Sequence, residues 1–137
     1  MPGDWDDDLG IDPEALARAE AALDALSSHY LSWAEADLAS LQDALAQLQA
    51  QPDAPAPLAR LFTISHDMKG QAATFGYPLL THIGERLCRF IETHPAPDGA
   101  ALIRLADMVQ AISQVLTLRM EGDGGAAGRD LLTRLDT

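Results

Sequence analysis

Apolar residues recur along most of this chain at intervals of three, four and seven residues, which is the spacing of one face of an α-helix. The segments with this pattern are separated by short stretches rich in proline and glycine. No segment shows the alternation of apolar and polar residues that is typical of a half-buried strand. We predict helices over residues 13–50, 57–75, 78–93 and 100–120, and a short final helix that contains Leu131, Leu132 and Leu135.

Proline, glycine and capping residues mark where these helices begin and end. Asp12-Pro13-Glu14 offers an N-cap, a proline at the first helical position and an acid in the first turn. Gly76-Tyr77-Pro78 predicts a tight helix corner, with Gly76 just past one helix and Pro78 opening the next. Ser27-Ser28-His29 is a weak point, so the pattern allows either one bent helix or two helices over residues 13–50.

Short linkers between amphipathic helices place neighbouring helices antiparallel. We therefore predict an all-α protein, an antiparallel up-and-down four-helix bundle with an N-terminal helical extension and a short C-terminal helix. Residues 1–12 are expected to form an acidic flexible arm, because Asp4, Asp6, Asp7 and Asp8 crowd a segment that also contains proline and glycine. Residues 13–137 are expected to form a single bundle domain.

Composition narrows the possible partners. The formal net charge of -12 would repel nucleic acid and anionic membrane surfaces. No apolar run approaches the roughly 18 residues that span a bilayer, so we expect a cytoplasmic protein, and we expect a monomer. Cys88 is the only cysteine, which excludes an internal disulfide, and its apolar neighbours predict that it is buried.

The residues that could take part in a reaction are concentrated on the helix predicted over residues 57–75. Lys69, the only lysine of the chain, follows His66 by three residues, and Gly70 follows it by four. Residues at these spacings share one helix face. A glycine inside a helix costs about 0.5–1 kcal/mol relative to alanine, so Gly70 suggests that something must approach the backbone closely. The alternative is that His66 and Lys69 are ordinary solvated residues and that Gly70 serves helix packing.

The same segment resembles the motif of histidine-containing phosphotransfer (HPt) domains, His-x-x-Lys-Gly followed by a second glycine and a leucine. These positions are filled by His66, Lys69, Gly70, Gly76 and Leu80, and the likeness continues with Gly84 and Leu87. Gln71 and Ala72 replace small polar residues that are often found after the Lys-Gly pair, and Cys88 replaces a common acid. These departures bear on partner preference rather than on the phosphorylation chemistry.

The resemblance implies a phosphorelay carrier that accepts a phosphoryl group from a receiver-domain aspartate onto His66 and passes it to another response regulator. Lys69 would stabilise the phosphoryl group, and Gly70 would allow the receiver to approach closely. The partners would be receiver domains and a hybrid histidine kinase. The domain would bring no metal or cofactor of its own, since the receiver supplies Mg²⁺, and no kinase activity is expected.

Other functional residues are predicted with open alternatives. Phe62 and Ala73 are candidate docking residues near His66, although Phe62 can equally be core, and Arg60, Arg86 and Arg89 could rim that patch. Tyr30 and Trp33 are expected in the core. His82 and Glu85 have a spacing that can ligate metal, but no second ligand pair accompanies them.

Two other functions fit less well. One is the phosphoacceptor bundle of a histidine kinase, which His66-Asp67 resembles, although Lys69-Gly70 does not. The other is an HPt-like adaptor that binds a receiver without transferring phosphate.

Overall fold

The structure is a computed structural model that describes residues 12–136. Within that range the chain is helical and contains no strand, so the all-α prediction is confirmed. The elements are α2 (Pro13–Ala50), α3 (Pro55–Ala72), the 3₁₀ turn η1 (Ala73–Phe75), α4 (Pro78–Thr93), α5 (Gly99–Thr117) and α6 (Gly125–Asp136). The predicted acidic arm lies outside the described residues except for Asp12, whose carboxylate caps α2 by accepting from the Glu14 N–H.

The open question about residues 13–50 is resolved in favour of a single helix. Neither proline nor glycine interrupts α2, so Ser28 and His29 continue it. The bounds predicted for α4 are those of the structure. The predicted helix over residues 57–75 begins two residues earlier, and its last turn tightens into η1.

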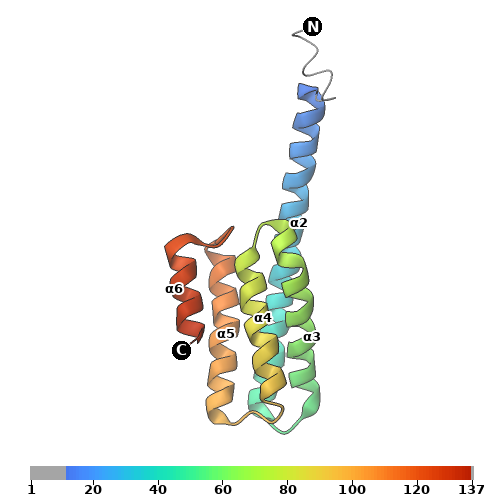
Figure 1. Cartoon of the computed structure of the whole chain (residues 1–137). Helices are drawn as coiled ribbons and strands as arrows, with labels where there is room; N and C mark the ends of the chain where they lie inside the picture. Colours follow the sequence, from blue (N-terminus) through green and yellow to red (C-terminus); the bar gives the residue numbers. More distant parts are fainter. Residues whose placement is uncertain (1–11, 137) are drawn as a thin grey trace.

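The four long helices form a closed ring of contacts. α2 packs against α3 and α5, and α4 packs against the same two helices. Figure 1 shows that successive helices run in alternating directions, and that α6 lies outside the ring, where it contacts α4 and α5. The core of the ring includes Leu41 and Leu48 of α2, Leu61 of α3, Ile83 of α4 and Ile112 of α5.

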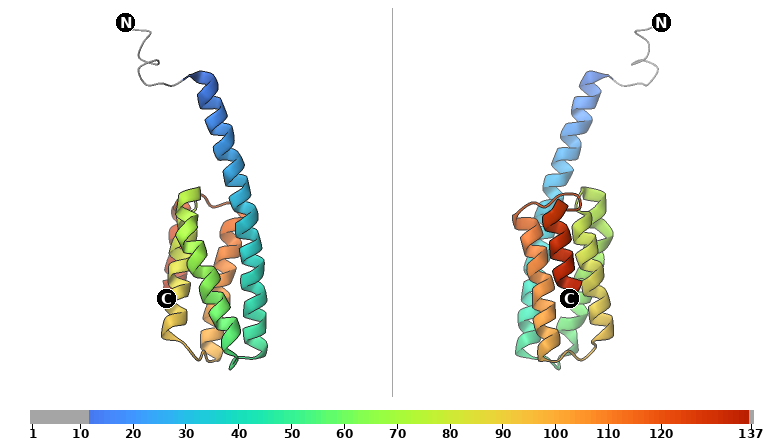
Figure 2. Two further views of the ribbon diagram at one scale, coloured as in Figure 1. Left: turned by 90° about the vertical axis from the view of Figure 1, so that its right-hand side faces the viewer. Right: turned by 60° about the vertical axis from the view of Figure 1, so that its left-hand side comes forward.

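The first half of α2 extends beyond the end of the other helices (Figures 1 and 2). Leu16, Leu23 and Leu26 lie there with 48%, 62% and 46% of their surface exposed. At 100° per residue these leucines share the face that carries the buried Tyr30. The apolar stripe of α2 therefore continues past the helices that cover it in the bundle.

The expectation that Trp33 is core was wrong, whereas Tyr30 is buried as expected. The Tyr30 ring stacks on Phe75, with ring centroids 4.8 Å apart, and burial raises its pKa to about 12. Trp33 is 54% exposed. The reason is register: Ala34, and not Trp33, lies one and two heptads before the buried Leu41 and Leu48.

α5 begins one residue earlier and ends three residues earlier than the helix predicted over residues 100–120. Among the described helices it is the one that could cross a membrane by length and mean hydropathy alone. Its apolar residues are explained by the bundle, where Leu105, Val109, Ile112 and Val115 are buried. The apolar residues of α5 therefore contribute to the core of the bundle.

Candidate functional site

Helix α3 divides into an inner and an outer face. Leu61, Ser65, Met68 and Ala72 are buried toward the bundle. Ser65 has no exposed surface, and its hydroxyl donates to the Leu61 carbonyl over 2.7 Å. His66, the next residue, is turned away from the core, and 60% of its side chain is exposed.

The imidazole of His66 has two neighbours on α3. The ring of Phe62, one turn earlier, lies with its centroid 6.1 Å from that of His66. Nδ1 of His66 is 3.8 Å from Oδ1 of Asp67, too far for a hydrogen bond but close enough for attraction. In this conformation Nε2 is the ring nitrogen that faces away from the carboxylate.

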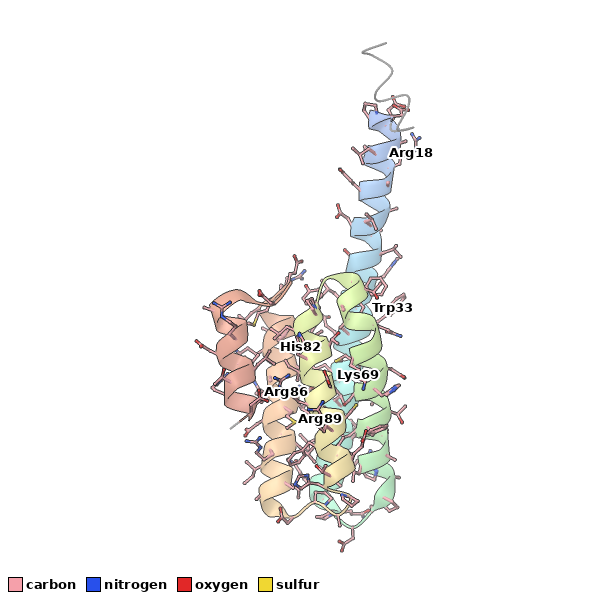
Figure 3. The ribbon with its side chains drawn as sticks, viewed as in Figure 1. Arg18, Trp33, Lys69, His82, Arg86 and Arg89 are labelled. Atoms are coloured by element: carbon pink, nitrogen blue, oxygen red, sulfur yellow. The ribbon has the colours of Figure 1, made fainter. Side chains whose placement is uncertain are left out.

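The backbone of Lys69 is held by a hydrogen bond from α4, and its side chain is partly exposed. The residue is half-buried and lies in the last turn of α3, one turn after His66. Figure 3 shows it where α3 and α4 lie side by side, at about the level of His82. The Thr81 hydroxyl of α4 donates to the Lys69 carbonyl over 3.0 Å. The backbone from which the Lys69 side chain extends is thus held in place by α4.

At Gly70 the backbone of this outer face of α3 is exposed. It is exposed, and a Cβ added there would meet no atom within 4 Å beyond its own helix and chain neighbours. Gly70 is thus not needed for packing between the helices of the bundle. Further along, Gly76 ends η1 with a φ of 90°, a backbone conformation that favours glycine.

The comparison with known families agrees with this geometry. A model of the Hpt domain family matches residues 25–115. The chain belongs to the Hpt domain family. No curated protein and no solved structure gives a significant match. The family is one of histidine phosphotransfer domains in phosphorelays, and the match spans all of α3 and α4. It leaves out the start of α2 and the whole of α6.

The predicted docking residues of this Hpt domain lie on either side of His66 along the chain. Phe62 is half-buried and packs against the core, so only part of its ring is available to a partner. Ala73 is exposed in η1. Both residues therefore have some free surface, and the exposed fraction is larger for Ala73.

Sequence reasoning missed a hollow on the other side of His66, between α2 and α3. It is lined by Trp33, Ala36, Asp37, Asp67, Gln71 and Phe75. Burial raises the pKa of Asp37, and the nearby Asp67 raises it further. Asp67 lines this hollow and also lies 3.8 Å from Nδ1 of His66, so the hollow borders the site. A signal in the sequence could have indicated that Trp33 is exposed. Ala34, Leu41 and Leu48 repeat every seven residues on the buried face of α2, and Trp33 is one residue out of step with them.

The arginines proposed to rim the patch are paired with acids instead. Arg60 binds Asp43 over 2.9 Å and Arg89 binds Glu85 over 2.9 Å. The guanidinium of Arg86 forms two hydrogen bonds to Asp136, of 2.6 and 2.9 Å, which tie α6 to α4 and lower the pKa of Asp136.

The remaining chemical candidates do not form a second site. His82 and Glu85 have no third partner, because among residues 12–136 no group of three or more potential ligands is arranged to hold a metal ion. Cys88 is buried, as predicted, with Sγ 3.9 Å from the Phe62 carbonyl oxygen.

Proposed function

We propose that this Hpt domain accepts a phosphoryl group from a receiver-domain aspartate onto His66 and passes it to the receiver of another response regulator. The scaffold of this activity is an antiparallel up-and-down four-helix bundle, which buries one face of α3 and offers the other to partners. The observation that carries the proposal is the outer face itself. An exposed imidazole lies one turn from the only lysine of the chain and beside an open backbone position.

In the proposed transfer, Nε2 of His66 attacks the phosphorus of the aspartyl phosphate in line with the departing carboxylate. The N–P bond forms as the P–O bond breaks, and the carboxylate leaves with the electron pair. Attraction to Asp67 favours the tautomer with the proton on Nδ1, which leaves the lone pair on Nε2. The reverse sequence delivers the phosphoryl group to the next aspartate.

Lys69 has a clear electrostatic task in this scheme. Lys69 lies one turn after His66 in the last turn of α3, where the helix end carries a partial negative charge. A phosphoryl group adds almost two further negative charges in a protein whose net charge is already -12. The ammonium of Lys69, one turn away, offsets both.

The partner contributes the rest of the chemistry and covers the site. In this proposal Mg²⁺ belongs to the receiver, and the domain acts as a carrier without kinase activity. An interface of ordinary size covers about 800 Å² on each partner. A receiver centred on His66 would therefore extend over Gly70, Phe62 and Ala73, and onto the hollow beside Trp33. We place this exchange in the cytoplasm, with a monomeric domain and a hybrid histidine kinase as a source of phosphoryl groups.

The proposal is tested by incubating the protein with a purified receiver that has been phosphorylated with radioactive phosphate. We expect label on the wild-type chain, stable to base and labile to acid, and no label on His66→Gln. The matched control is His82→Gln, because His82 is another exposed histidine and lies on α4 instead of α3. The control should be labelled like the wild type.

Each other outcome points to a different function. Equal labelling of His66→Gln would remove the carrier assignment. Binding of the receiver without label on the wild type would indicate an adaptor. Label acquired from ATP alone, without a receiver, would indicate the phosphoacceptor domain of a kinase.

A further inference from the structure

The end of α3 is held by α4 at the point where Lys69 lies. The last four carbonyls of an α-helix have no partner within the helix. In α3 these belong to residues 69–72. The Tyr77 N–H donates to the Ala72 carbonyl over 2.9 Å, and the Thr81 hydroxyl donates to the Lys69 carbonyl over 3.0 Å. Thr81 of α4 thus provides a hydrogen-bond donor for the carbonyl of Lys69 in the last turn of α3.

The backbones of the two helices are in contact at the same place. A Cβ on Gly84, one turn after Thr81, would lie 2.9 Å from Cβ of Lys69 and 3.1 Å from the carbonyl oxygen of Ser65. Ser65 directly precedes His66. Because Gly84 has no side chain, α4 lies against α3 closely enough for the Thr81 hydroxyl to reach the Lys69 carbonyl.

We propose that Thr81 is a positioning residue for phosphoryl transfer, which acts by holding the backbone of Lys69 so that its ammonium stays near His66. This inference rests on the proposed function. Thr81 is half-buried and bonds to a backbone carbonyl, so it acts through Lys69 and does not touch the phosphoryl group. Loss of the hydroxyl frees the last turn of α3 and lets the ammonium spend less time beside the phosphoryl oxygens.

Thr81→Val tests this role, because valine has the shape of threonine without the hydroxyl. We expect the transfer rate at saturating receiver to fall about two- to tenfold, the range that corresponds to one ordinary hydrogen bond. The receiver concentration that gives half of the maximal rate should stay unchanged. Thr81→Ser keeps the hydroxyl and should restore the rate, and the thermal midpoint of each variant shows that it is folded.

A double-mutant cycle separates this role from a merely structural one. If Thr81 acts through the lysine, Thr81→Val should have no further effect on the rate in a Lys69→Ala background. An equal fold-change in both backgrounds would overturn the inference, as would a wild-type rate for Thr81→Val or a slow rate for Thr81→Ser. A wild-type chain that takes no label would instead overturn the proposed function, and this role with it. The two failures are thus distinguishable.

Discussion

Gly70 and Gly84 are both glycines within helices, and they lie on opposite sides of the turn that carries Lys69. A Cβ on Gly70 would meet nothing within 4 Å, whereas a Cβ on Gly84 would press on Lys69 and on Ser65. Gly84 is therefore required by the packing of the bundle. Nothing in the bundle requires Gly70, so its cost in helix stability has to be explained by what approaches from outside. The same substitution at the two positions should have opposite effects.

The largest effect on stability is expected for Gly84→Ala. The added methyl group overpacks the contact between α3 and α4, and we expect it to lower the free energy of unfolding by about 1–3 kcal/mol. Chemical denaturation followed by circular dichroism measures this change. Stability equal to or above that of the wild type would show that the close contact does not constrain the bundle.

Gly70→Leu should affect partner binding instead of folding. The new side chain would stand on the open face beside His66, and we expect receiver affinity to fall at least about tenfold, or 1.4 kcal/mol. Isothermal titration with a receiver measures the affinity. Ala100→Leu, at an exposed position on α5, is the control and should bind like the wild type. Unchanged affinity of Gly70→Leu would refute the argument for close approach.

The smallest effect is expected for Gly70→Ala. Alanine removes backbone freedom from the unfolded chain and meets no neighbour in the fold, so the free energy of unfolding should rise by about 0.5–1 kcal/mol. The same denaturation experiment measures it beside Gly84→Ala. Destabilisation by both alanines would remove the distinction between the two glycines.

The sequence predicted those features that depend on residues close together in the chain. Proline and glycine gave the bounds of α4 and the corner at Gly76, because they act on their own backbone. The spacing of His66, Lys69 and Gly70 was sufficient to place them near one another, because residues three and four apart are neighbours on any helix.

Specific pairs of residues that meet between helices were not predicted. The hollow beside Asp67 needs Trp33 and Asp37 of α2 next to α3, and the pairing of Arg86 with Asp136 spans 50 positions. The stripe of Leu16 and Leu23 was visible, but its exposure follows from how far the other helices reach. Periodicity describes one helix, and it does not show which neighbour covers each face.

The central claim is that His66 is the one residue that carries the phosphoryl group. The chain has four histidines, so the direct measurement is to locate the phosphate after incubation with a phosphorylated receiver. Tandem mass spectrometry under neutral to alkaline conditions, which preserve phosphohistidine, should find a single phosphate on His66. Phosphate on another histidine, or an unmodified His66 beside a receiver that has lost its phosphate to this chain, would contradict the account.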